Sequence, residues 1–489
     1  VSMCSHKSKR CLISVLVLGV LNLVIGIVTL SSYSSILKQA FVHNLALTPD
    51  SYSHDLWSET PIPMYIKFYF FNWTNPDEFI SIHSKPRFEE IGPYTYSEHH
   101  VKVNVTWAPE NASVTYMQER VWVFVPEMSN GTEDDLVRTL NVPLVSASAT
   151  VKDWSPFLIK MFDFAIKSMN EMIALSGTVR ELLFQGIETP LMKISNDFHI
   201  PVPYDKFGWF YMRNNSPYFD GVFNMDTGVN DIMKIGKLNT WNYSHHNGFY
   251  PDHCGLVNGS AGEFFPPLQT RTNITLYVSD ICRSITLNYR QDVSLEGIPG
   301  YSYVADHTLF MNPPDDAPDN WCFCLKRGCQ PSGVLDVSSC RYDSPSYVSY
   351  PHFLYADPIY TADVEGLDPD ESKHLTHIDL EPETGVPLSV FARFQINIAL
   401  QKVRGLEIFE HINEIMMPII WFETSANLDS ALASPLRLFK AAPTILATVG
   451  SIVLIIGIVL ILFGITGLVR RRNVDRLLLG SENDLKPTL

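Results

Sequence analysis

The sequence predicts an α+β protein in which a large extracellular domain lies between two membrane-spanning helices. Three observations support this architecture. Uncharged apolar runs lie near both ends of the 489-residue chain, all the acceptor motifs for N-linked glycans lie between them, and several segments of that region alternate as strands do. A helix needs about 20 apolar residues to cross a bilayer core of roughly 30 Å, and both runs fit that length.

The first apolar run covers residues 12–30, and its one strongly polar residue is Asn22. Such a run could also be a cleaved signal peptide. The apolar core of a signal peptide is usually shorter, so the length favours an uncleaved anchor. The second run covers residues 445–469. We therefore expect one transmembrane helix in each run.

Basic residues flank both runs on their outer sides. Short basic flanks stay in the cytosol. The pattern therefore predicts cytosolic tails at 1–11 and 470–489 and an extracellular domain at 31–444. The basic residues are Lys7, Lys9 and Arg10 before the first run and Arg470, Arg471, Arg472 and Arg476 after the second.

The motif Asn-x-Ser/Thr accepts N-linked glycans only on the lumenal or extracellular side. Every match lies between the two apolar runs and none lies in a tail, which agrees with the topology. The motifs predict a glycosylated ectodomain. The acceptors are Asn72, Asn104, Asn111, Asn130, Asn214, Asn242, Asn258 and Asn273.

Six of the 8 cysteines lie in the predicted ectodomain, four of them within the stretch 320–340. Such a cluster could hold zinc, but zinc sites favour C-x2-C knuckles in a cytosolic setting. An even number in an oxidising compartment favours three disulfides, for which about fifteen pairings are possible. The six are Cys254, Cys282, Cys322, Cys324, Cys329 and Cys340.

The other two cysteines, Cys4 and Cys11, lie in the predicted N-terminal tail beside the first span. Cysteines at this position are candidates for palmitoylation. Unmodified thiols are the alternative.

The composition and the motifs exclude several classes of function. The chain carries a net charge of −16, and most of its tail charge is basic, so a nucleic-acid partner is not expected. The sequence contains no G-x-S-x-G elbow, H-E-x-x-H motif or Walker loop, so we expect no enzyme activity and no cofactor. His245, His246, His253 and Cys254 match no standard metal-ligand spacing, so no metal site is expected.

Four segments alternate as strands and are bounded by turn residues: 63–73, 119–126, 272–279 and 389–400. A helix is expected to begin at Ser155 and Pro156 and to end at Gly177. A second, shorter helix should follow, because Thr178 and Glu181 have the spacing of a capping box, and it should end at Gly186. These helices predict a helical region at about 153–186 on a β-rich domain.

The first of these helices carries a narrow polar stripe that includes Lys160, Asp163 and Lys167. One interpretation is a solvated face on which lysine pairs with Asp163. The other is a local cationic patch on an acidic ectodomain, which would attract anionic lipids or particles. The second interpretation makes Lys160 and Lys167 candidate ligand-binding residues.

Several motifs give the chain a resemblance to a known family. They are FYFFNWTNPDEF (68–79), EIGPYTY (90–96), VRELLFQG (179–186), SDICRSI (279–285), PHFLYADP (351–358), GLDPDESKH (366–374) and IDLEPETGVPLSV (378–390). In this order the chain resembles the class B scavenger receptors, or fatty-acid translocase family, and some stretches resemble its croquemort-like invertebrate members.

The resemblance implies a β-barrel-like ectodomain topped by a helical bundle, with an apolar tunnel leading toward the membrane. It implies capture of lipids, lipoproteins, apoptotic cells or other anionic lipid-bearing particles, uptake by phagocytosis, and transfer of lipid to the bilayer. It also implies disulfides between Cys254 and Cys322, Cys282 and Cys340, and Cys324 and Cys329. The family's apical ligand patch corresponds to residues 157–175, with a basic residue near Lys167.

The expected location is the plasma membrane, because the C-terminal tail has leucines at 477–479 but no acidic residue four positions before a leucine pair. A homo-oligomer is possible. Two other functions compete with a lipid receptor. A two-span ligand-gated channel subunit would need polar or small residues lining a span. An ectoenzyme would need a phosphate loop with acidic partners.

Overall fold

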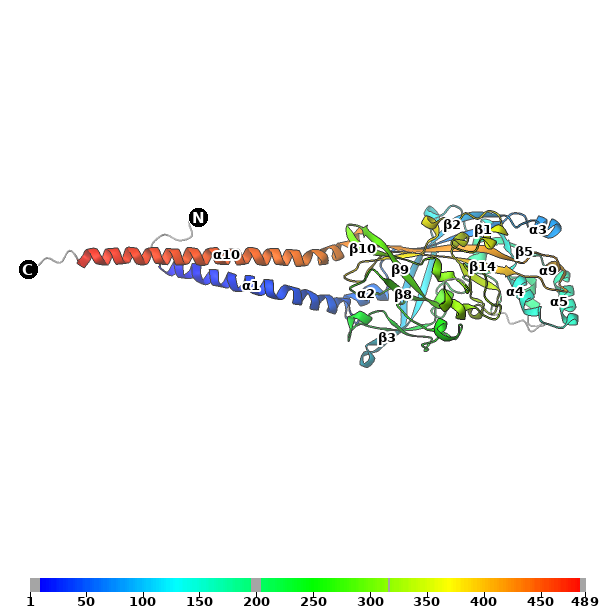
Figure 1. The fold of residues 1–489 in the computed structure, drawn as a ribbon, viewed down its shortest axis with the longest axis horizontal. Helices are drawn as coiled ribbons and strands as arrows, with labels where there is room; N and C mark the ends of the chain where they lie inside the picture. Colours follow the sequence, from blue (N-terminus) through cyan, green and yellow to red (C-terminus); the bar gives the residue numbers. More distant parts are fainter. Residues whose placement is uncertain (1–8, 195–203, 315–316, 484–489) are drawn as a thin grey trace, which may run out of the picture. The chain divides into compact units, whose positions relative to one another are not determined.

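The computed structural model describes residues 9–194, 204–314 and 317–483 of the chain. It divides into two compact units. One consists of the helices at the two ends of the chain, and the other is the domain Leu45–Ser430 (Figure 1).

Two long helices, α1 (Lys9–Leu45) and α10 (Ser430–Asn483), make up the first unit. Both are long and apolar enough to cross a membrane. A Cβ atom placed on Gly457 would lie 2.6 Å from the backbone nitrogen of Leu23, so α1 and α10 come into backbone contact there.

The helices extend beyond the predicted spans on the ectodomain side, and the expected boundaries of the ectodomain at 31 and 444 stay predictions. Residues 31–45 contain no proline or glycine, and α1 runs through them. At the other end α10 begins at Ser430 and continues through Pro443. The compact domain is correspondingly shorter, Leu45–Ser430.

A sheet of 13 strands forms the body of the domain, in the order β7-β6-β3-β2-β1-β15-β14-β13-β10-β9-β8, with β12 joined to β14 and β11 to β12. The edge strands β7 and β8 are linked through Ser260, which bridges Lys237 beside β7 and Leu276 in β8, so the sheet is a nearly closed barrel. The strands are β1 (Met64–Trp73), β2 (Phe88–Ala108), β3 (Ser113–Phe124), β6 (Val222–Asp226), β7 (Leu238–Trp241), β8 (Asn273–Val278), β9 (Arg283–Leu295), β10 (Ile298–Val304), β11 (Leu335–Asp336), β12 (Ser346–Ser349), β13 (His377–Leu380), β14 (Pro387–Leu400) and β15 (Ile415–Asn427).

The four segments predicted as strands are strands in the structure: β1, β3, β8 and β14. In β1 the even-numbered residues from Ile66 to Phe70 are fully buried and their neighbours Lys67 and Tyr69 are partly exposed. This period of two is the signal that identified the strand. β3 begins earlier than expected, at Ser113.

Short helices gather at one end of the domain, and α2 (Tyr52–Ser58) lies at the other end (Figure 1). A small separate sheet pairs β4 (Leu136–Leu140) with β5 (Ala174–Thr178) at the helical end. The helices at that end are α3 (Pro76–Ile82), α4 (Val142–Val151), α5 (Pro156–Ser168), α6 (Pro190–Ile194) and α9 (Glu407–Glu410), and the other short helices are α7 (Pro358–Ala362) and α8 (Glu371–His374).

The first predicted helix ends earlier than expected. Ser155 is its N-cap by backbone conformation and Pro156 is its first residue, but α5 ends at Ser168, and Asn170 follows with φ 54°. The expected end at Gly177 is wrong because residues 174–178 form the strand β5, which pairs with β4.

The capping box is confirmed. The Thr178 amide donates to the Glu181 carboxylate at 2.9 Å, and the Glu181 amide donates to Oγ1 of Thr178 at 3.3 Å. The short helical segment that follows ends at Gly186, whose φ of 75° favours glycine. The region 153–186 is thus two short helical segments with a strand between them.

Three disulfides staple the loops around β8 to β12: Cys254–Cys322, Cys282–Cys340 and Cys324–Cys329. These are the pairs that the family resemblance implied. Cys254, Cys282 and Cys322 are buried in one apolar cluster with residues of β9 and β14. The cross-links therefore fix the part of the domain that has the shortest regular elements.

Replacing Cys340 with serine should impair folding in the secretory pathway. The Cys282–Cys340 bridge spans 58 residues, and in the chain-entropy model a loop of that size contributes roughly 4 kcal/mol. We expect poor glycan maturation and intracellular retention, measured by endoglycosidase sensitivity. Ser339→Ala is the matched control, because the Ser339 hydroxyl has no hydrogen-bond partner. Wild-type maturation of Cys340→Ser would contradict the expectation.

Candidate functional site

A cavity of about 280 Å³ lies inside the domain, between the sheet and the helical end. Its volume is near the lower end of small-ligand pockets, which run from roughly 300 to 1,000 Å³. The apolar residues that line it are Ile66, Val142, Pro143, Ala147, Leu191, Met192, Phe207, Trp209, Phe210, Phe219, Ile281, Val337, Val348, Phe394, Ile396 and Phe422.

The fold places these side chains by strand alternation and helix periodicity. Phe394 and Ile396 are two residues apart on β14 and share a face. From α4, Val142 and Ala147 line the cavity. Asn141 caps this helix by accepting a hydrogen bond from the Leu144 amide, so the start of α4 is fixed.

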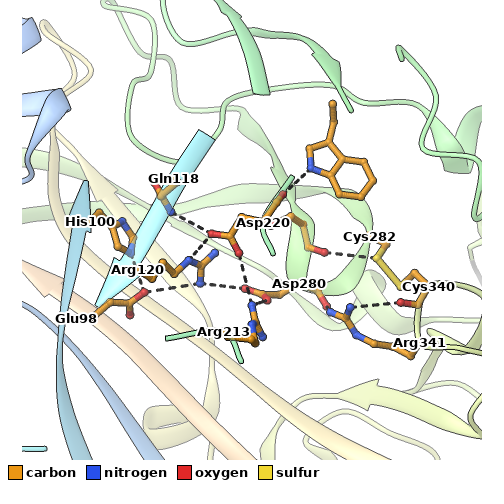
Figure 2. A network of polar contacts seen from close by, with 12 residues as sticks. Glu98, His100, Gln118, Arg120, Arg213, Asp220, Asp280, Cys282, Cys340 and Arg341 are labelled. Carbon is orange, nitrogen blue, oxygen red and sulfur yellow. Dashed lines mark hydrogen bonds and ion pairs between the residues drawn. A yellow bond between two sulfur atoms is a disulfide. The ribbon is translucent and has the colours of Figure 1, made fainter. Parts of the chain in front are cut away.

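Several charged residues form a connected network (Figure 2), and four of its members, Arg120, Arg213, Asp280 and Arg341, line the cavity. Nε of Arg120 lies 2.6 Å from Asp220, and Nη2 of Arg213 lies 2.6 Å from Asp280. A second bond of Arg120, at 3.3 Å, joins it to Asp280. Glu98, 3.7 Å from Arg120, extends this network away from the cavity.

The network shifts the titration of its acids toward lower pH. Burial acts to raise the pKa of Asp280, but the guanidinium groups of Arg213 and Arg120 outweigh it, so the pKa lies well below the ordinary value. Burial likewise acts to raise the pKa of Glu98, and His100 and Arg120 lower it overall. Both carboxylates are therefore charged at neutral and mildly acidic pH.

Arg341 joins this network through backbone groups. Its guanidinium donates to the carbonyl oxygens of Cys340 and Asp280. Arg341 follows Cys340 in the chain, and Asp280 precedes Cys282, so the disulfide brings the two together (Figure 2). Burial and then repulsion from Arg213 lower the pKa of Arg341, and the attraction of Asp280 does not offset them.

The helix α5 presents an apolar face to the outside. Phe157, Met161 and Phe164 are 71%, 47% and 74% exposed. They recur at the spacing of one helix face. The opposite face, with Phe162 and Ile166, is buried in the main core, which also contains residues of α4.

The two predicted ligand-binding lysines lie on α5 in different surroundings. Lys160 is exposed. Lys167 hydrogen-bonds Asp163 at 2.6 Å and also pairs with Glu407 of α9, and these partners raise its pKa. Neither lysine is among the described residues that line the cavity. The pairing with Asp163 is the one that the solvated-face interpretation predicted.

Sequence reasoning missed the charged side of the cavity. Arg120, Arg213, Asp280 and Arg341 belong to no motif that points to a ligand. A signal was nevertheless present, because Asp280 and Arg341 lie beside the cysteines of the Cys282–Cys340 disulfide. Charged residues beside paired cysteines are brought together by the bond.

The remaining predicted sites are distributed over the surface. Six glycan acceptors are exposed, and Asn72 and Asn214 are half-buried. The Asn214 side chain exchanges two hydrogen bonds with the backbone of Trp122. Glycosylation of all eight stays a prediction.

The histidines examined as metal ligands hydrogen-bond backbone carbonyls: His245 that of Asn239, His246 that of Asp252 and His253 that of Asp319. His253 also lies beside Cys254 and Cys322, whose sulfur atoms are bonded to each other.

Of the cysteines considered for acylation, Cys4 lies outside the described residues. Cys11 lies in α1 and is disulfide-bonded. A bonded sulfur cannot carry an acyl chain. Acylation of Cys11 therefore stays a prediction for its reduced thiol.

Comparison with known proteins agrees with this architecture. The family model described as CD36 family matches residues 17–468. The chain belongs to the CD36 family. This membership confirms the resemblance to the class B scavenger receptors and, with the two apolar helices, makes the chain a membrane protein.

Individual CD36 family relatives cover most of the chain. It is 34% identical over 445 residues to Protein peste of Drosophila melanogaster, covering 89% of this chain and 79% of that protein. It is 32% identical to Scavenger receptor class B member 1 of Bos taurus, covering 94% and 89%. It is 31% identical to Lysosome membrane protein 2 of Homo sapiens, covering 87% and 88%. The family therefore includes a member named for the lysosome.

The Asp280→Asn variant should reveal how the charged network depends on pH. A carboxyl whose pKa is lowered by folding contributes stability above its unfolded value, here 3.8, and loses it as the pH falls through the folded value. At pH 7 the variant should lose about 3 kcal/mol of unfolding free energy, because it removes one of the two carboxylates that Arg120 and Arg213 share.

Below pH 4 the difference in unfolding free energy between the variant and wild type should shrink, because Asp280 takes up a proton in the unfolded wild type while it stays charged in the folded chain. Denaturant unfolding at pH 7, 5 and 3 measures it. Asp77→Asn is the control, since Asp77 forms an exposed pair with Arg138 and should cost at most about 1 kcal/mol at any pH. A loss that is constant over the pH range would contradict the electrostatic account.

Proposed function

We propose that this chain is a cell-surface receptor that captures lipids and lipid-bearing particles and takes single lipid molecules into the cavity of its extracellular domain. The observation that carries the proposal is the apolar cavity between the sheet and α4, in a chain of the CD36 family. The names of the scavenger receptor relatives support a role in uptake.

Capture is proposed to occur on the exposed face of α5. An exposed apolar patch with a charged rim is typical of a surface that contacts a protein or a membrane. Phe157, Met161 and Phe164 could enter the outer layer of a lipid particle, and Lys160 beside them could contact an anionic headgroup. The occupant we propose is the phospholipid surface of such a particle.

Uptake into the cavity is supported by the chemistry of its walls. An acyl chain that leaves a particle would expose its methylene groups to water, at about 0.8 kcal/mol each. The aromatic and aliphatic side chains of the cavity remove that cost. Residues of α4 line the cavity, and the buried face of α5 belongs to the same core as α4. We propose that the cavity is part of a tunnel that passes lipid to the membrane.

The alternative functions have less support. A channel subunit needs a polar pore, whereas the residues 445–469 of α10 include only Thr448, Ser451 and Thr466 as hydroxyl side chains. Each of these hydroxyls is hydrogen-bonded to a carbonyl of its own helix. For an ectoenzyme, the sequence offers no phosphate loop.

The capture step can be tested with paired variants. Phe157→Asp with Phe164→Asp should reduce binding of phosphatidylserine vesicles at least tenfold, because two apolar contacts are lost. Leu268→Asp is the control, since Leu268 is 67% exposed in the loop before β8. Vesicle capture is measured at matched surface expression. Equal capture by both variants would contradict docking on α5.

The lysines can be tested in the same assay. Lys160→Glu with Lys167→Glu should reduce capture, and the loss should shrink as the salt concentration rises, because salt screens the charges. We expect most of the loss from Lys160, because Lys167 is paired with two carboxylates. If the stripe is a solvated face, the double reversal leaves capture unchanged at low salt.

The proposed location is the plasma membrane, with both tails in the cytosol. Surface biotinylation of cells that express the chain should label most of the mature glycoprotein. Labelling of almost none of it, together with co-migration with lysosomal markers, would instead place the chain with the lysosomal relative.

A further inference from the structure

The charges that line the cavity are unequal in sign. Four basic side chains line it, those of Arg120, Lys206, Arg213 and Arg341, against a single described acidic side chain, that of Asp280. In a cavity whose other walls are mostly apolar, charges interact strongly because little water screens them. An excess of cations on such a wall favours an anionic occupant.

The basic groups differ in how their charges are balanced. Arg120 and Arg213 share Asp220 and Asp280 at 2.6 to 3.6 Å. In contrast, the hydrogen bonds of Arg341 go to backbone carbonyls, which carry no full charge. Burial and repulsion from Arg213 lower the pKa of Arg341, and the attraction of Asp280 does not offset them, so its cationic form is only partly compensated in this position.

Two further donors on the cavity wall have unused capacity. Nε of Arg213 and Nε1 of Trp209 are buried and have no hydrogen-bond partner, and both residues line the cavity. Arg213 is only 6% exposed, so solvent does not satisfy it. A buried donor without a partner costs about 1–3 kcal/mol, and an acceptor in the cavity would recover that cost.

We propose that Arg341, Arg213 and Trp209 form a headgroup site that selects lipids with an anionic carboxylate or phosphate, whose chain lies along the apolar wall. This inference rests on the proposed function, because it takes the cavity as the lipid site. The carboxylate oxygens of a fatty acid and the phosphate oxygens of a lysophospholipid are both acceptors that suit guanidinium and indole donors.

The same geometry disfavours neutral lipids. A fatty alcohol can bury the same chain, but its hydroxyl cannot neutralise Arg341. A site built from hydrogen-bond donors rejects an analogue that lacks the matching acceptor, because the donors are then left unpaired. The charged side of the cavity thus determines which lipid headgroup is selected, and the apolar walls provide general affinity for acyl chains.

The test compares oleate, oleoyl lysophosphatidate and oleyl alcohol, which have the same chain, on the full-length glycoprotein in nanodiscs. Wild type should bind both anionic probes at least tenfold more tightly than the alcohol. Arg341→Gln should lose about tenfold in affinity for the anions and leave the alcohol unchanged. In this variant Asp280 still forms ion pairs with Arg120 and Arg213, so the substitution leaves no buried acid unpaired.

A second variant tests the headgroup site even if Arg341→Gln folds poorly. Trp209→Phe removes Nε1–H and keeps an aromatic ring, and should lose several-fold affinity for the anions alone. Arg271→Gln is the matched control, because Arg271 forms an exposed pair with Asp292. Whichever anionic probe binds wild type more tightly identifies carboxylate or phosphate as the preferred headgroup.

The outcomes separate the two proposals. If all three probes bind wild type equally and the variants change nothing, the headgroup site is wrong and the cavity remains a lipid site. If the variants weaken the alcohol as much as the anions, the residues shape the cavity without selecting charge, which also overturns the site. If no probe binds, both the headgroup site and the proposed lipid cavity fail.

Discussion

The pairing of β1 with β15 is the constraint on which the rest of the domain depends. It joins Met64 to Ala426 and Phe70 to Ile420 in antiparallel register, bringing together the first and last strands of the domain. The other strands are added outward from this pair: β2, β3, β6 and β7 on one side, and β14, β13, β10, β9 and β8 on the other. The two edges then meet through Ser260. A sheet closed in this way has an interior, and the cavity lies where α4 covers it. Closing the sheet has a large entropic cost, because long-range strand pairing closes long loops of chain. The buried aromatic side chains of β1 offset this cost.

The charged network is a costly addition to such an interior. Taking Arg213 and Asp280 out of water has a desolvation penalty that their attraction only partly offsets, and apolar residues of the same volume would often be at least as stable. What the network provides is placement. Arg120 is held from β3, and Asp280 and Arg341 are held by the Cys282–Cys340 bridge, so the guanidinium groups have fixed positions on the cavity wall. Fixed dipoles and charges in a water-poor site act without reorganising when a ligand enters.

Sequence reasoning succeeded where the deciding physics is local. The alternation of β1 and the capping box of Thr178 and Glu181 involve residues a few positions apart, and both are present. It failed where a distant segment decides. Residues 174–178 have an apolar pattern that suits a helix or a strand, and pairing with β4 makes them a strand. The sequence suggested Asp163 as a partner for lysine on this helix, but it could not reveal that Glu407, 240 residues away, also binds Lys167. The cavity could not be predicted for the same reason, because its walls come from strands and helices spread over most of the domain.

The distribution of basic residues bears on how an acidic receptor could handle anionic lipids. A chain with a net charge of −16 repels an anionic particle over most of its surface, and the neutralised Lys167 does little to change that. The exposed face of α5 instead offers apolar contact, which does not depend on the charge of the particle and is hardly weakened by salt. Arg341, a cation that Asp280 compensates only in part, lies on the cavity wall, where a low dielectric strengthens its attraction for an anion. Under the proposed function, docking of the particle and selection of the molecule are thus governed by different forces at different places, and a change in one need not alter the other.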